Sequence, residues 1–367
     1  MDLEVYTRSM EFIGVVDNFS VLKWHRKYYK AGTFEITCPL TQDNLELLKR
    51  DNVIYKSNDE AGIILHRGIK LVNDKEVLSI RGSFLVSILN RRIVWDTLCY
   101  KGTVEGLFRQ IVDSNCITTK SERVIPLLHL GALKGYAKSL DYQKTGGNVL
   151  EELERLSNTY GIGFKVNFIY DTKELEFEVY KGIDRSENQN VNEKALFSRE
   201  YENVLSQDYT ESIGDYKNTV LIAGSGEGIN RKKTSIEIGQ GLDRYEMYVD
   251  ARDLQNTKTV NDTEVSIPDS EYIPMLQQRG KSKLEEYKEI KTFDAVINTN
   301  QNQENLVYRK DYDLGDIVTV FDWKWDITLD TRITEIEEIY QNSGISINVI
   351  FGNDIPTVLD KIRRMVK

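Results

Sequence analysis

Residues 148–180 read NVLEELERLSNTYGIGFKVNFIYDTKELEFEVY, and they contain both kinds of secondary structure that the chain uses. In the first half, apolar residues recur along one face of a helix, at Val149, Leu153, Leu156 and Tyr160. Asn148 with Glu151 three residues later resembles a capping box, and Gly161 supplies the left-handed residue that ends a helix. The spacing predicts a helix over about 149–160.

The second half of this stretch alternates with the period of strands. Apolar side chains occupy every other position at Phe164, Val166, Phe168 and Tyr170, and again at Leu175, Phe177 and Val179. Asp171-Thr172-Lys173 lies between the two runs and predicts the turn of a hairpin. A helix followed at once by a hairpin is typical of an α+β module, which we place at residues 97–195.

Upstream, a second helix of this module is predicted by apolar residues at helical spacing after Thr103, at Val104, Leu107, Phe108, Ile111 and Val112. The first 95 residues indicate mostly strands, with a hairpin that turns at Asn73-Asp74. One short helix is expected from Thr41 to Lys49, with Thr41 as its cap. We predict a small β-barrel or sandwich over residues 1–96.

Downstream, strands return after the polar segment Asp184 to Glu193, and we predict a β-rich region over residues 196–352. Its main strands are expected at about 226–260 and 310–352, with an inserted helix at about 271–289. The last segment, 353–367, is predicted to be a C-terminal helix that begins near Pro356. The predicted fold class is therefore β-rich and multidomain, of mixed α+β type.

Composition excludes several classes of protein. The 367 residues carry 48 Lys and Arg against 58 Asp and Glu, a net charge of −10, whereas a protein that wraps nucleic acid needs excess basic residues. No window approaches the ~18 apolar residues of a membrane helix, and the N-terminus lacks the basic start and apolar run of a signal peptide. We expect the chain to be made in the bacterial cytoplasm and not secreted by a signal peptide.

The titratable residues form no recognisable catalytic or metal motif. There are only three cysteines, and no two of them form a CxxC motif: Cys38, Cys99 and Cys116. The three histidines are far apart in sequence, at His25, His66 and His129. Cys116 could use His129 as a base, but its position after an apolar helix face favours a packed thiol. We predict no catalytic, cofactor-binding or metal-binding residue, and no cofactor.

Three further features of the sequence are interpreted as structural. The run Gly224-Ser225-Gly226-Glu227-Gly228 lacks the third glycine and the following helix of a dinucleotide loop, which favours a hairpin turn. Paired carboxylates such as Glu335 with Glu337, or Glu337 with Glu338, could suggest the active site of a glycoside hydrolase. In a chain with 58 acidic residues, however, such pairs are expected by chance. Trp323 and Trp325 share one face of a predicted strand, where a core or subunit contact is favoured over stacking on sugars.

Several segments, in order along the chain, resemble one family: the tail-hub (baseplate hub) proteins of phages and prophages of Gram-positive hosts, including contractile phage-tail-like bacteriocins. The segments that carry the resemblance are Trp24 to Ile36, Arg81 to Trp95, Gln143 to Glu151, Glu237 to Leu254, Tyr312 to Val320 and Asp330 to Ile336. None of these segments is a catalytic signature, so the resemblance implies an architecture and not a reaction.

The resemblance implies a homotrimer in which two β-barrels per chain form a pseudo-six-fold ring, decorated by the α+β module. The first barrel would come mainly from residues 1–96, with strands near 200–225 as candidates to complete it, and the second β-barrel region, within 196–352, mainly from about 226–260 and 310–352. Such a ring joins the tail tube to the tail tip or spike and the baseplate in a virion tail or phage-tail-like particle. Its partners would be tail-tube, tape-measure or spike, and baseplate proteins, with DNA only as passing cargo. We further hypothesise that part of the acidic excess, about −30 for three chains, lines the lumen and keeps DNA from adhering.

The leading hypothesis is thus a structural, non-enzymatic tail-hub protein. One alternative is a tail-associated cell-wall-degrading enzyme, a peptidase or muramidase, which would require a metal or nucleophile constellation. Another is a carbohydrate- or receptor-binding tail module, for which Trp323 and Trp325 are the candidate residues.

Overall fold

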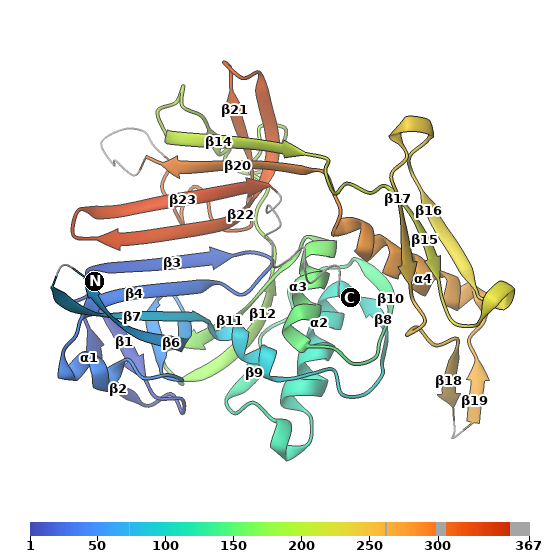
Figure 1. Cartoon of the computed structure of the whole chain (residues 1–367), viewed down its shortest axis with the longest axis horizontal. Helices are drawn as coiled ribbons and strands as arrows, with labels where there is room; N and C mark the ends of the chain where they lie inside the picture. Colours follow the sequence, from blue (N-terminus) through green and yellow to red (C-terminus); the bar gives the residue numbers. More distant parts are fainter. Residues whose placement is uncertain (73, 261–262, 299–305, 353–367) are drawn as a thin grey trace.

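The computed structural model describes residues 1–72, 74–260, 263–298 and 306–352. Figure 1 shows a large sheet formed by both ends of the chain, a middle region of helices and short sheets, and an outer part that projects away from the large sheet. The predicted β-rich α+β class is confirmed. Among the described residues, no helix is long and apolar enough to cross a membrane.

The large sheet has thirteen strands among the described residues, and eleven of them follow one path. In spatial order these are β14 (Val204–Ser212), β20 (Ile290–Ile297), β23 (Gly344–Gly352), β22 (Ile327–Gln341), β3 (Val21–Lys27), β4 (Thr33–Pro39), β7 (Lys75–Phe84), β6 (Glu60–Val72), β5 (Val53–Ser57), β1 (Leu3–Tyr6) and β2 (Phe12–Val16). The remaining two are β21 (Ile317–Asp322), which pairs with β22, and β13 (Leu196–Phe197), which pairs with β21.

The prediction of two closed β-barrels is wrong, because within the described ranges no sheet closes on itself. The reason is the antiparallel pairing of β3 with β22, which places Trp24 opposite Glu338 and Arg26 opposite Ile336. This pairing joins the N-terminal and C-terminal strands into one continuous sheet, so β2 and β14 remain as its two edges. The strand at 204–212 pairs with β20 and not with the N-terminal strands.

Local predictions in the first 95 residues agree with the structure. Helix α1 (Gln42–Leu47) begins after Thr41, whose side chain accepts a hydrogen bond from the amide of Asn44 at 3.1 Å. Strands β6 and β7 form the predicted hairpin. Asn73 of its turn lies outside the described residues, as does the whole segment 353–367 for which we predicted a C-terminal helix.

The middle region contains two helices and two small sheets. Its elements are β8 (Leu98–Thr103), α2 (Val104–Val112), β9 (Leu128–Leu130), β10 (Ser139–Lys144), α3 (Val149–Tyr160), β11 (Gly163–Ile169) and β12 (Glu174–Tyr180). Both predicted helix caps are present: Thr103 accepts from the amide of Gly106 at 3.1 Å and Asn148 from that of Glu151 at 3.2 Å. Gly161 ends α3 with φ +65°, as its position predicted.

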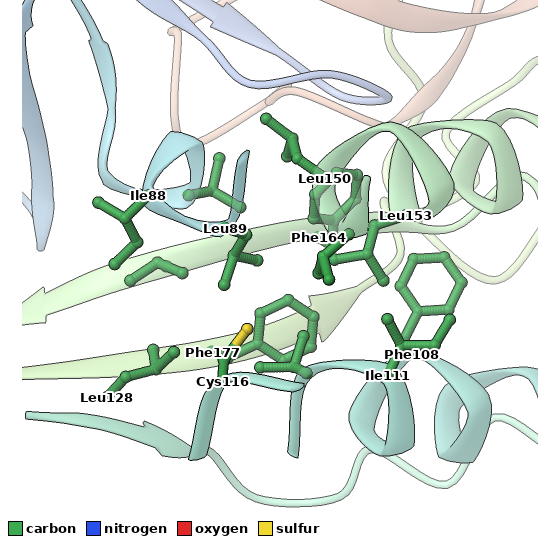
Figure 2. Packing of buried hydrophobic residues seen from close by; sticks show 14 of the residues in the cluster. Ile88, Leu89, Phe108, Ile111, Cys116, Leu128, Leu150, Leu153, Phe164 and Phe177 are labelled. Carbon is green, nitrogen blue, oxygen red and sulfur yellow. The ribbon is translucent and has the colours of Figure 1, made fainter. Parts of the chain in front are cut away.

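The core of the middle region is a large cluster of hydrophobic side chains (Figure 2). Phe108 from α2, Leu153 from α3, and Phe164 and Phe177 from the hairpin are all buried and belong to one cluster. The 3-10 turn at Leu85–Arg91 adds Leu89 from the end of β7. Burying large aliphatic and aromatic side chains in one cluster is the main source of stability for this region.

The outer part, residues 219–289, is here called the outer module. Strands β15 (Thr219–Ala223), β16 (Lys233–Glu237) and β17 (Glu246–Asp250) form a sheet in the order β16-β15-β17, and β18 (Thr257–Val260) pairs with β19 (Thr263–Ser266). Helix α4 (Asp269–Glu285), predicted at about 271–289, contacts β15 and β16. Gly280 allows this close approach, since a Cβ there would lie 2.6 Å from the side chain of Ile222.

Candidate functional site

The residues considered for nucleophilic chemistry are not arranged for it. Cys116 is fully buried in the middle core, and burial raises the pKa of its thiol to about 12, so the reactive thiolate is suppressed. His129 instead faces Glu176, with Nε2 3.7 Å from a carboxylate oxygen. The interpretation of Cys116 as a packed thiol is confirmed. Within the described part of the chain, no group of three or more His, Cys, Asp or Glu side chains is placed to hold a metal ion.

The glycine-rich run has the predicted structure. Gly224 to Gly228 connects β15 to β16, which are antiparallel neighbours, so the run is a hairpin connection. The two tryptophans differ from expectation, because Trp323 and Trp325 lie in the turn between β21 and β22 and not on a strand. Trp323 is 71% exposed, which excludes a core position within this chain.

Exposed apolar side chains gather first at the edge of the large sheet. Strand β2 pairs only with β1 among the described residues, and its outer edge is bare. On it Phe12 and Val15 are more than two-fifths exposed, and Ile13 nearly as much. An edge strand with unpaired backbone groups and apolar side chains on both faces can pair with a strand of another chain. Soluble monomers avoid exposing such an edge.

The hairpin of β6 and β7 carries a second apolar surface. β5 pairs with β6 only as far as Ile63, so the hairpin beyond it has no neighbour on the β6 side among the described residues. Ile69 is 56% exposed and Leu71 is 70% exposed, although Ile69 lies opposite Leu78, which is fully buried. The apolar face of the sheet therefore continues beyond the part of the core that this chain covers.

The junction of β3 and β22 contains a cluster of buried and partly buried charged and aromatic side chains, here called the seam cluster. Its members are Trp24, Arg26, Lys56, Glu60, Tyr308, Arg309, Asp313, Glu338 and Tyr340. They come from β3, β5, β6, β22 and the segment before β21. Because they are drawn from both ends of the chain, they hold together the two halves of the large sheet.

Each charge in the seam cluster has more than one partner. Glu338 forms an ion pair with Lys56, lies 3.0 Å from Arg309, and accepts hydrogen bonds from Tyr308 at 2.8 Å and Tyr340 at 2.5 Å. Burial alone would raise the pKa of Glu338, but the Lys56 ammonium, the hydrogen bond from Tyr340 and the Arg309 guanidinium outweigh burial and hold the pKa at about 2. Glu338 is therefore ionised over the whole physiological range.

Glu60 is the second acid of the cluster. It accepts a hydrogen bond from the Trp24 indole at 2.9 Å, and its carboxylate lies 2.7 Å from Arg26 and 3.0 Å from Arg309. Arg26 also pairs with Asp313 and donates to Tyr308 at 2.7 Å. The cluster is thus a connected network in which each ionised group is satisfied, the condition under which buried charge is tolerated.

Sequence reasoning missed the burial of Glu335 and Glu338. The pairing of β22 is irregular between Ile333 and Glu335 but regular from Glu335 onward. Glu335 and Glu338, three residues apart, therefore lie on opposite faces of the sheet, and both are buried. One signal was available: His25-Arg26-Lys27 places basic residues in succession on a strand, so at least one must point inward and needs an acid.

A cleft of about 540 Å³ separates the large sheet, α3 and the outer module. Acidic and basic side chains both line it, among them Glu151 and Arg155 of α3, Arg279 and Lys283 of α4, and Glu335 of β22. Glu335 lies 2.5 Å from His25 and 3.1 Å from Lys27. Since opposite charges pair within the cleft, its lining favours neither an anionic nor a cationic ligand.

Comparisons with known proteins agree on one class. A family model described as Siphovirus ReqiPepy6 Gp37-like protein matches residues 2–353. No curated protein matches the sequence.

Three solved structures share the fold with a TM-score of 0.55 each. The prophage tail protein gp18 from Listeria monocytogenes is 12% identical, and the alignment covers 100% of this chain and 98% of that one. A tail protein from Neisseria meningitidis is 12% identical, with 96% of each chain covered. The 43 kDa tail protein of prophage MuSo2 from Shewanella oneidensis is 11% identical, with 96% and 98% covered. At these identities the likeness shows the fold alone.

Proposed function

This chain belongs to the family of Siphovirus ReqiPepy6 Gp37-like proteins, and from that premise we propose that it is a structural tail-hub protein whose copies close into a ring of three. The resemblance to phage and prophage tail proteins is confirmed by the family match and by the fold. The ring, its position and its partners are our proposal.

The observation that carries the proposal is the open large sheet with an apolar edge. β2 at one end and β14 at the other each have one neighbour among the described strands. Both edges expose apolar side chains, with Phe12 56% exposed on β2 and Leu205 62% exposed on β14. A contact between two different edges is heterologous, and such contacts produce a closed ring when the rotation between copies divides the circle evenly.

In the proposed ring the role is geometric and non-enzymatic. The large sheets surround a channel between the tail tube and the tip or spike, and the middle region and outer module offer outward surfaces to baseplate proteins. The site of action is the virion tail. We retain the hypothesis that acidic side chains line the channel, through which DNA passes, because the formal charge is −10 per chain.

The test is the mass of the purified chain by light scattering, with negative-stain imaging of the main peak. We expect ring-shaped particles with a mass of three times 42.4 kDa or a whole multiple of that mass. Phe12→Asp should abolish the trimer, since it places a charge in the edge contact. Leu133→Asp is the matched control, because Leu133 is 68% exposed on the middle region, away from either edge. A trimer unaffected by Phe12→Asp would refute the edge contact.

A second candidate function, glycan binding, rests on exposed aromatic rings near the β21–β22 turn. The Trp323 ring lies 5.8 Å from that of Phe321, which in turn lies 5.0 Å from Tyr201, and Tyr201 is 50% exposed. Such rings stack on sugars or cover a subunit contact. A glycan screen of the wild type and of Trp323→Ala distinguishes these uses. Glycan binding that is lost in the variant would support a sugar-binding role, and no binding by the wild type would refute it.

A further inference from the structure

The outer module contains one short motif twice. Gly226-Glu227-Gly228-Ile229-Asn230-Arg231 and Gly239-Gln240-Gly241-Leu242-Asp243-Arg244 share the order glycine, acid or amide, glycine, aliphatic, Asn or Asp, arginine. The conformation repeats as well. Gly228 and Gly241 both have φ +53°, and each begins a single 3-10 turn. The first copy precedes β16 and the second follows it, so the two turns lie at opposite ends of this strand.

Each turn presents its aliphatic residue to solvent. Ile229 is 99% exposed and Leu242 is 98% exposed. A connection that only reverses the chain needs no large apolar side chain at its tip, and full exposure of one gains no burial energy. We call Ile229 and Leu242 the two tips.

The arginine of each motif anchors its tip to the outer module. Arg231 donates to the carbonyls of Gly224 and Ala223, each at 2.7 Å, and to the hydroxyl of Tyr248 at 2.8 Å. Arg244 pairs with Glu246 and lies 3.2 Å from Glu237. The tips are therefore held in place before any partner arrives, which lowers the entropy that binding costs.

Between the tips lies a bare edge. Strand β16 pairs with β15 alone among the described strands, so its other side presents unpaired backbone groups. Beside it, Leu221 and Tyr248 lie in register on one face of the sheet and are 43% and 55% exposed. The opposite face is covered by α4, which packs on Ile222.

The sequence around this edge is complementary to itself. In an antiparallel pairing of two β16 strands centred on Ser235, Lys233 of each copy lies opposite Glu237 of the other. The same register brings the Ile229 tip of one copy to the Leu242 tip of the other. This is because Ile229 lies six residues before Ser235 and Leu242 lies seven residues after it. Opposite charges face each other and apolar tips meet, on both sides of the two-fold axis.

We propose that β16 pairs with β16 of a second copy of this chain, forming one sheet that continues across both copies, with the two tips of each copy packed against those of the other. This contact is isologous and closes on itself in pairs. It is independent of the proposed ring, whose contact joins two different edges. A chain that makes the pair alone forms dimers, and one that makes both contacts forms hexamers of two rings.

Light scattering of the full chain over a range of concentrations distinguishes these contacts. Two or six chains per particle support the pairing, whereas one or three at every soluble concentration overturns it. The ring is tested separately by whether the number of chains per particle is a multiple of three. A dimer would therefore support the pairing and refute the ring, and a trimer would support the ring and refute the pairing.

A charge exchange locates the contact at β16. Lys233→Glu alone and Glu237→Lys alone should each lose the pair, because like charges then face each other at both ends of the strand. Mixing the two variants should restore it in particles that hold one of each, since both acids of the first variant then face both bases of the second. Even-numbered particles that persist in both single variants would place the contact elsewhere and overturn the proposal.

The tips are tested by the double variant Ile229→Asp with Leu242→Asp. It should raise the concentration at which half of the chains are paired at least tenfold. The matched control is Val191→Asp, because Val191 is 90% exposed but lies outside the outer module. Unchanged circular dichroism in all variants excludes unfolding as the cause. Cross-links from β16 to a strand of a different protein in assembled tails, together with an isolated chain that stays unpaired, would also overturn the proposal. The partner of β16 would then not be a second copy of this chain.

Discussion

The core of the middle region and the seam cluster are both buried, but they are held together in opposite ways. In the core, aromatic and aliphatic side chains such as Phe164 and Phe177 contribute by the area they remove from water (Figure 2). In the seam cluster, Glu60 and Glu338 contribute only because Arg26, Lys56 and Arg309 surround them. Apolar burial tolerates imperfect partners, whereas a buried charge requires each of its partners.

The two regions also differ in where their residues come from. The core is built largely from one continuous part of the chain, between about 85 and 180. The seam cluster joins residues 24–60 to residues 308–340 and lies where the two halves of the sheet meet. A directional network at that junction fixes the pairing of β3 with β22, a specificity that non-directional packing does not supply.

The largest expected effect is in the core. Phe177→Ala removes a ring that is fully buried and should lower the free energy of unfolding by about 3–5 kcal/mol, because it leaves a cavity in dense packing. Denaturant titration followed by circular dichroism measures the loss. Phe177→Leu, which refills part of the space, should lose clearly less. Equal losses for the two variants would mean that shape and not buried volume governs the core.

The seam cluster should respond almost as strongly to a change of one atom. Glu338→Gln keeps the side-chain volume but leaves the buried Lys56 ammonium without its main partner, so we expect a loss of about 3 kcal/mol. The control is the neighbouring Glu337→Gln, since Glu337 is only partly buried and should cost about 0.5 kcal/mol or less. If both variants lose the same amount, the seam is not a network of obligatory partners.

Acid should weaken the seam cluster through protonation of the buried carboxylate of Glu338. The pKa of Glu338 is held at about 2, below its ordinary value of 4.5. Its contribution is therefore complete above pH 4.5 and is lost as the pH falls toward 2, with a slope that approaches about 1.4 kcal/mol per pH unit. Urea titrations from pH 6 to pH 2 should show a shallower decline for Glu338→Gln than for wild type. Parallel curves would contradict the assignment.

The smallest effect is expected when the seam is made to resemble the core. Replacing both members of the buried pair, Lys56→Met with Glu338→Leu, leaves neither charge unpaired, and Arg309 retains Glu60. The double variant should lie within about 1 kcal/mol of wild type, less than the single change at Glu338. Losses that simply add would show that Lys56 and Glu338 act independently.

What could be predicted from the sequence follows the same division. Helices α2 and α3 were predicted with their caps at Thr103 and Asn148, because capping and helical spacing are local properties. The hairpin of β11 and β12 was predicted for the same reason, since its alternation and its turn lie in one short segment. The apolar core of this region therefore follows directly from periodicity.

The joining of the sheet could not be predicted in this way. The pairing of Trp24 with Glu338 spans most of the chain, and no local pattern distinguishes an edge that closes a barrel from one that meets a distant strand. Glu335 and Glu338 are buried on opposite faces of one strand, which a simple alternation of buried apolar and exposed polar residues does not predict. The repeated tips at Ile229 and Leu242 were visible in the sequence, but their exposure and their places at the two ends of β16 required the structure.

The chain leaves the large sheet at the end of β14 and returns to it at the start of β20, and these points are paired: Ser212 lies opposite Ile290. Everything between them, residues 213–289, thus occupies the position of an ordinary hairpin turn. Exchanging such an insertion costs the sheet little, because the two ends that must be bridged are already neighbours. The outer module can therefore be exchanged, in evolution or by design, without breaking the pairing of the large sheet, provided that the contacts of α4 with α3 and β10 are replaced as well.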